Sequence, residues 1–173
     1  MFTEITLFAL ISTLALFSFI GAGVVRFGLL PSYSAYSSKW GQAVPMNNMN
    51  LWSVVTFVAA FLLCPALLEL GAASMWQFLG FLTPVYLITV SLTPEWQTKL
   101  GQYRVHMIAA ALCAIGGLGW LVFIMHALKV LACVFAFVMT MALFSGTAKT
   151  STIFWLEMFM FISVYSTVLL AIL

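Results

Sequence analysis

The sequence contains no aspartate, and only 6% of its 173 residues are charged. A water-soluble domain of ordinary composition carries about 25% charged residues, which cover the surface that faces the solvent. Here 65% of the residues are hydrophobic, so the few charges cannot cover a water-facing surface. The shortage of charge excludes an ordinary soluble domain and predicts a membrane protein.

Metal-ligating residues are also scarce. The three cysteines fall inside apolar stretches and form no CxxC pair (Cys64, Cys113, Cys133). A zinc site needs three or four ligands, and His106 and His126 are expected at opposite membrane faces, which also excludes paired haem ligands. No phosphate-binding or dinucleotide fingerprint is present. We therefore expect no metal and no cofactor. The net charge of +2, without a basic run, gives no sign of a nucleic-acid partner.

Long apolar runs are abundant, and about 20 apolar residues are needed for one helical span. Continuous apolarity rather than strict alternation argues against a strand barrel. The first run is too long for the hydrophobic core of a signal peptide, so we interpret it as a retained span. The sequence predicts an all-α bundle, a single domain over 1–173 with six transmembrane helices at about 5–26, 51–70, 75–92, 103–125, 128–144 and 153–173.

The basic residues predict the orientation of these spans. Five of them fall on the side of the connections 27–50, 93–102 and 145–152 (Arg26, Lys39, Lys99, Arg104, Lys149), and only Lys129 falls on the other side. Connections rich in Lys and Arg stay in the cytoplasm. We therefore predict a protein of the cytoplasmic (inner) membrane with loops one, three and five in the cytoplasm and both termini outside.

Ionisable side chains inside a membrane are costly and tend to face the bundle interior. Arg26, His106 and Glu157 all fall near the cytoplasmic ends of their spans, at the level of the serine- and tyrosine-rich stretch 32–37. Glu157 stands among apolar neighbours, so its carboxyl must find a partner or take up a proton. The structural interpretation is an ion pair of Glu157 with Arg26 or Arg104. The functional interpretation is a cytoplasm-facing polar pocket.

Trp120 is the only one of the six tryptophans that we place deep in a span, where its ring N–H needs a partner. The neighbouring glycines in Ala114–Gly119 predict close helix packing rather than a broken helix. The candidate pocket residues are Arg26, Ser32, Ser34, Tyr36, Arg104, His106, Trp120 and Glu157.

Three stretches carry a family resemblance: "PSYSAYS", "GQYRVHMIAAALCAIGGLGWLVF" and "FWLEMFMFISVY". They resemble the PxSISxxYY-like, GKVH-like and FWLE-like motifs of small multi-span proteins found in gut Bacteroidetes and their phages. Tyr33 and Ala35 depart from that pattern, which has an aliphatic residue and often an acid there. The resemblance implies a multi-span membrane fold of bacterial or phage origin and brings no activity. It selects Ser32, Ser34, His106, Trp120 and Glu157.

Membrane hydrolases of the alkaline-ceramidase kind are also similar, since they are compact bundles with serine and histidine near one face. Their aspartate and their HxxxH zinc ligands are absent from this sequence. This departure removes the metal and the mechanism that depends on it.

These observations favour a non-enzymatic bundle whose pocket binds a small polar or lipid-headgroup ligand, or which serves assembly or pore formation as a homo-oligomer. The alternative is a proton-coupled transporter that uses Glu157 as its titrating group. A metal-independent hydrolase using Ser32 or Ser34 with His106 and Glu157 is a further alternative, because these residue types can form a triad. Beyond the lipid bilayer, the sequence identifies no partner, ligand or substrate.

Overall fold

The regular secondary structure of the described residues is helical, as predicted, and no strand is present among them. The computed structural model describes residues 2–44, 50–94 and 96–173, so Glu95 lies outside the described residues. The helices in chain order are α1 (Phe2–Phe27), the short 3-10 helix η1 (Tyr33–Ala35), α2 (Tyr36–Ala43), α3 (Leu51–Leu70), α4 (Gln77–Ser91), α5 (Leu100–Phe123), α6 (Leu128–Phe144) and α7 (Thr152–Ile172).

Four of these helices, α1, α3, α5 and α7, are long and apolar enough to cross a membrane. The other two predicted spans are shorter. Helix α4 has 15 residues because the chain turns through residues 71–76 before the helix begins. At about 1.5 Å per residue it is about 22 Å long, against a hydrocarbon core of about 30 Å. Helix α6 has 17 residues, so its length is closer to the thickness of the hydrocarbon core than that of α4.

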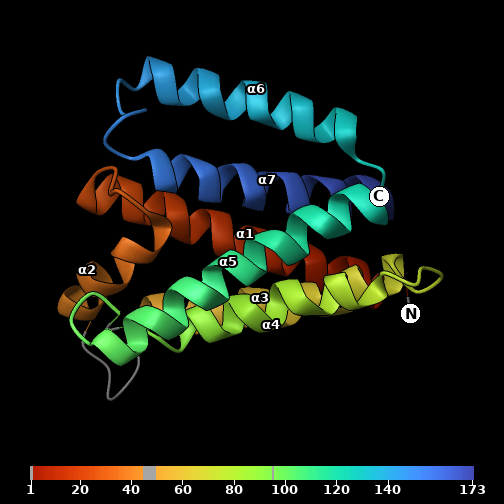
Figure 1. Ribbon diagram of the computed structural model, residues 1–173, viewed down its shortest axis with the longest axis horizontal. Coiled ribbons are helices and arrows are strands. Elements are labelled where there is room, and N and C mark those ends of the chain that lie inside the picture. The colour runs from red at the N-terminus through yellow and green to blue at the C-terminus, as the bar shows by residue number, and fades with distance from the viewer. Residues whose placement is uncertain (1, 45–49, 95) are drawn as a thin grey trace.

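Figure 1 shows the helices arranged in layers, with α6 outermost, α7 next to it, α1 and α5 in the middle, and α3 and α4 on the far side. Helix α1 begins and α7 ends at one end of the bundle. Helix α2 lies at the opposite end, together with the α4–α5 and α6–α7 connections. We call this second end the loop end. The five basic residues of the predicted cytoplasmic side all belong to it, and Lys129 lies at the start of α6, at the other end.

Small residues let α5 approach its neighbours closely. A Cβ added to Gly116 would lie 3.0 Å from the Thr83 hydroxyl of α4, and one added to Gly117 would lie 3.4 Å from Val164 of α7. Glycine is therefore required where α5 passes α4, because any larger side chain would force the helices apart. This agrees with the close packing that the sequence predicted for this stretch.

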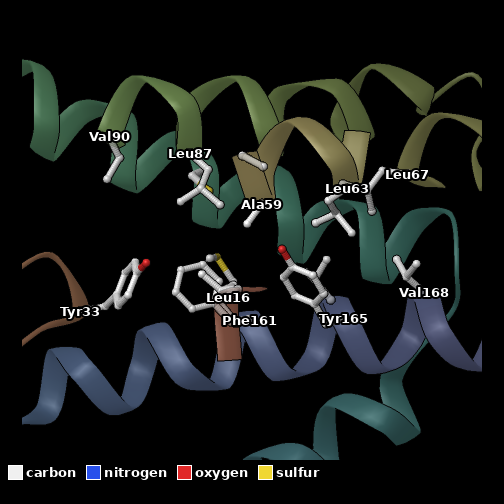
Figure 2. Packing of buried hydrophobic residues seen from close by; sticks show 14 of the residues in the cluster. Leu16, Tyr33, Ala59, Leu63, Leu67, Leu87, Val90, Phe161, Tyr165 and Val168 are labelled. Atoms are coloured by element: carbon white, nitrogen blue, oxygen red, sulfur yellow. The ribbon is translucent and has the colours of Figure 1, made fainter. Parts of the chain in front are cut away.

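Aromatic and aliphatic side chains fill the space between α7 and the layer of α3 and α4. Figure 2 shows Tyr33, Phe161 and Tyr165 standing in a row above α7, with Leu63 of α3 and Leu87 of α4 opposite them. Tyr33 comes from η1 rather than from a spanning helix. The loop that follows α1 therefore contributes directly to the core.

The described part of loop one, residues 28–44 and 50, is folded into the loop end of the bundle. Tyr33, Tyr36 and Trp40 are buried there. The Ser37 hydroxyl donates to the Pro94 carbonyl at 3.0 Å, which joins loop one to the α4–α5 connection. Hydropathy predicts 27–50 only as a connection and gives no sign of η1 or α2, because the composition of these two helices is polar. Residues 45–49 of this loop lie outside the described residues.

Candidate functional site

A cavity of about 210 Å³ lies at the loop end, between α5 and α7. An apolar cavity of about 150 Å³ accommodates benzene, so this one has room for roughly eight to ten non-hydrogen atoms. Its walls come from η1, α4, α5 and α7 and consist of Tyr33, Ser34, Leu87, Val90, Ala110, Cys113, Ala114, Ile153, Leu156, Glu157, Met160 and Phe161.

The cavity exists because α5 presents only small side chains to α7 at this end. The two helices touch near Gly117, and from there α5 diverges from α7 toward the loop end (Figure 1). Ala110 and Ala114 are too short to fill the widening space. On the α7 side, Ile153 and Leu156 line the cavity while 57% and 56% of their surfaces remain exposed. The rim of the cavity is therefore apolar and open at the outside of the bundle.

Glu157 is the ionisable group at the polar end of this cavity. The backbone N–H of Tyr33 donates to its Oε2 at 2.5 Å, and the Ser34 hydroxyl also bonds to the carboxyl. One turn before Glu157, the N–H of Phe154 donates to the Pro31 carbonyl at 2.9 Å. These bonds hold loop one against the first turns of α7. They satisfy part of the carboxyl and leave its remaining lone pairs for the cavity.

The side chain of Tyr33 is held by a hydrogen bond and by two aromatic contacts. Its hydroxyl bonds to the Thr56 hydroxyl of α3 at 2.7 Å. Its ring packs against the rings of Trp52 and Phe161, with centroids 5.5 Å away in both cases. Burial raises the pKa of the Tyr33 hydroxyl, so the group stays neutral and keeps its bond to Thr56. The backbone N–H that reaches Glu157 is therefore rigidly positioned.

The expected ion pair of Glu157 is not formed within the described part of the chain. Its partners there are the Tyr33 N–H and the Ser34 hydroxyl. The guanidinium of Arg26 instead lies 5.4 Å from the ring centroid of Trp40, and Arg104 is exposed on α5. No lysine, arginine or histidine is among the described residues that line the cavity. The one acidic or basic side chain on the described lining, apart from the Tyr33 hydroxyl and the Cys113 thiol, is therefore the Glu157 carboxyl.

His106 is buried in a separate place, at the corner between α4 and α5. Its Nδ1 bonds to the Thr93 hydroxyl at 2.8 Å. Its ring stacks on Trp96, with centroids 4.8 Å apart. The Trp96 ring N–H donates to the Ser34 carbonyl at 3.3 Å. Trp96 therefore connects the histidine to loop one, while the histidine does not line the cavity.

The remaining candidates have local roles. Ser32 caps η1 by accepting the N–H of Ala35 at 3.1 Å. The Tyr36 hydroxyl donates to the Gly28 carbonyl at 2.7 Å and so closes the turn after α1. The ring N–H of Trp120 donates to the Leu67 carbonyl at 3.1 Å, which supplies the partner that its depth requires. Of the eight candidates, Ser34 and Glu157 line the cavity.

No family model, curated protein or solved structure matches this chain. The argument for function therefore rests on the geometry of the site.

The described lining of the cavity joins one carboxyl and one serine hydroxyl to apolar side chains. The described residues hold no group of three or more His, Cys, Asp or Glu side chains that could bind a metal. A hydroxyl and a carboxyl meet at Ser34 and Glu157, but the imidazole that a triad needs is held by Thr93 and Trp96. The cavity therefore combines one carboxyl, that of Glu157, with a lining of mostly apolar side chains.

Sequence reasoning missed several residues that form the site. The sequence places Tyr33 in the polar stretch 32–37 at the level of Glu157 but assigns it no contact, and it gives no sign that Trp96 covers the imidazole. Ala110 and Ala114 stand out by their small size, four residues apart on one face of α5, and this spacing was available in the sequence. Nothing in the sequence showed that the backbone N–H of Tyr33 would reach Glu157.

Proposed function

We propose that this chain is a non-enzymatic integral protein of a bacterial cytoplasmic membrane whose loop-end cavity binds a small amphiphilic ligand from the lipid phase. The observation that carries the proposal is the shape of the cavity. It is apolar along α5 and α7, it has a carboxyl and a hydroxyl in its wall, and two of its aliphatic lining residues, Ile153 and Leu156, are exposed at the outside of the bundle. Sites for small ligands commonly combine an apolar lining with a few placed polar groups.

Six spans and cytoplasmic loops one, three and five are part of the proposal. Four helices have the length and the composition of spans. Helices α4 and α6 are apolar but shorter, and a short span is accommodated by local thinning of the bilayer. The basic residues at the loop end support a cytoplasmic position for it.

Binding is favoured over transport by the interior beyond the cavity. Phe161 lines the cavity on the side toward the middle of α7. The next polar group on the same face is Tyr165, whose hydroxyl bonds to the Ser12 hydroxyl at 2.8 Å. That serine also donates to the Ala59 carbonyl at 2.7 Å. These groups bond to one another, and Phe161 lies between Tyr165 and Glu157 along the same face of α7.

The test is photo-crosslinking in lipid nanodiscs with a neutral alkyl alcohol that carries a diazirine on its chain. We expect labelling of α5 near Ala110 and of α7 near Leu156. The double variant Ala110→Leu, Ala114→Leu fills the cavity and should remove this labelling. Ala111→Leu, on the exposed side of α5, is the matched control. Equal labelling of the filled and control variants would overturn the proposed function.

A further inference from the structure

We infer that the ligand of this cavity is a single-chain amphiphile with a cationic amine head and that Glu157 selects the amine. The inference rests on the proposed function and names the chemical class of its ligand. Its evidence is the charge distribution around the cavity together with the volume and the position of the opening.

One carboxyl and no basic side chain line the described part of the cavity. Glu157 is the one Asp, Glu, Lys, Arg or His residue there, beside the neutral hydroxyl of Tyr33 and the neutral thiol of Cys113. A phosphate or carboxylate head placed here would meet a carboxyl with no compensating base, which is unfavourable away from water. An ammonium head would stabilise the ionised form of the carboxyl through a charge-assisted hydrogen bond. The surroundings thus discriminate against the anionic heads of common lipids.

The contacts of Glu157 fit this role. Its Oε2 is held by the Tyr33 N–H, so the carboxyl is oriented before a ligand arrives. The Ser34 hydroxyl at the same end can accept a second ammonium proton through its oxygen. A primary amine carries three donors, and these two side chains supply acceptors for two of them.

The size of the cavity indicates a single chain. A volume of about 210 Å³ is too small for a phospholipid headgroup with its glycerol and two chains. It accommodates an amine and the first several carbons of a chain. The rest of the chain would leave between Ile153 and Leu156, whose exposed apolar surfaces face the outside of the bundle. We therefore expect an amine whose alkyl chain is long enough to fill the cavity and to extend from it into the bilayer.

The experiment measures competition against the photoactive alkyl alcohol by dodecylamine, dodecanol and dodecyl phosphate in nanodiscs of zwitterionic lipid. We expect dodecylamine to compete at a concentration about tenfold below that of dodecanol, and dodecyl phosphate to compete least. Glu157→Gln should bring the ratio of amine to alcohol close to one while alcohol labelling persists. Comparing ratios between proteins cancels the unequal partitioning of the competitors into the membrane.

Glu69→Gln is the matched control, because Glu69 lies near the C-terminus of α3, at the end of the bundle away from the cavity. This variant should keep the preference for the amine over the alcohol. Butylamine, with the same head and a short chain, should fail to compete; competition equal to that of dodecylamine would assign the site to a water-soluble amine and overturn the membrane-derived ligand. If all three heads compete equally, or the phosphate competes best, the amine inference is wrong and the binding function stands. If no alcohol labels the cavity of the unmodified protein, the proposed function itself fails.

Discussion

The backbone N–H of Tyr33 donates to the carboxyl of Glu157 at 2.5 Å, across 124 positions of the sequence. This bond joins the loop after α1 to the start of α7 and orients the carboxyl at the end of the cavity. One side chain thus serves both the fold and the proposed site. The two roles separate experimentally, because the backbone donor needs only an oxygen acceptor, while an amine ligand needs a charge.

Replacing Glu157 tests the structural role. Glu157→Ala leaves the Tyr33 N–H without its acceptor, and we expect it to lower the free energy of unfolding by about 1–3 kcal/mol. Glu157→Gln retains an oxygen in the same place and should cost less than Ala. Unfolding in mixed detergent micelles, followed by tryptophan fluorescence, measures the difference. Equal losses for the two variants would show that the bond to Tyr33 contributes little.

The buried histidine gives a second prediction. Thr93→Val keeps the shape of the side chain but removes the hydroxyl that bonds to His106 Nδ1, so we expect a loss of about 1–2 kcal/mol. Thr89→Val is the matched control, because the Thr89 hydroxyl bonds only to the Val85 carbonyl of its own helix among its described contacts. The same unfolding assay applies. A loss in the control as large as in Thr93→Val would contradict the role of the Thr93–His106 bond.

The crossing of α4 with α3 and α5 depends on Gly80. A Cβ there would lie 2.9 Å from the Leu67 carbonyl and 3.0 Å from the Trp120 ring. We expect Gly80→Ala to destabilise the protein by about 1–3 kcal/mol, because the crossing is overpacked. Gly21→Ala, with open space at the Cβ, should be neutral or stabilising by up to about 1 kcal/mol. Similar effects at both glycines would show that α4 can shift without cost.

The proposed orientation is tested from both sides of the membrane. In a variant without the three native cysteines (Cys64→Ala, Cys113→Ala, Cys133→Ala), single cysteines at Arg104→Cys and Lys129→Cys should react with a membrane-impermeant maleimide from opposite sides. Arg104→Cys should label only after the cytoplasmic face is opened, and Lys129→Cys in intact cells. A reporter fused after Leu173 should read as outside. Labelling of both cysteines from the same side would contradict the six-span arrangement.

Hydropathy predicted the long helices well, because a span is defined by length and apolarity. Helix α3 has the bounds predicted for it, 51–70, and α6 has the bounds 128–144. Helix α4 begins later than predicted, since hydropathy does not detect the turns at 71–76. The polar segment that forms α2 gave no periodic apolar signal, and its position depends on long-range bonds such as the one from Ser37 to Pro94.

The candidate site was predicted in part. Depth along the membrane placed Ser34, His106 and Glu157 at one level, and the structure puts all three at the loop end. Depth does not say which neighbour a side chain meets. Trp96 covers the imidazole and bonds to loop one, so His106 is held apart from Glu157. The backbone donor of Tyr33 carries no residue-specific signal and was beyond sequence reasoning.

The attachment of loop one to α7 also sets an order of assembly. Tyr33 and Ser34 are synthesised early, but Glu157 and the Phe154 N–H that hold loop one belong to the last described helix. Because chains leave the ribosome from the N-terminus, the bonds from loop one to α7 form only after α3, α4, α5 and α6 have been synthesised. A chain stalled before α7 has neither the wall nor the acid of the cavity. Occupancy of the cavity would therefore report that insertion has been completed.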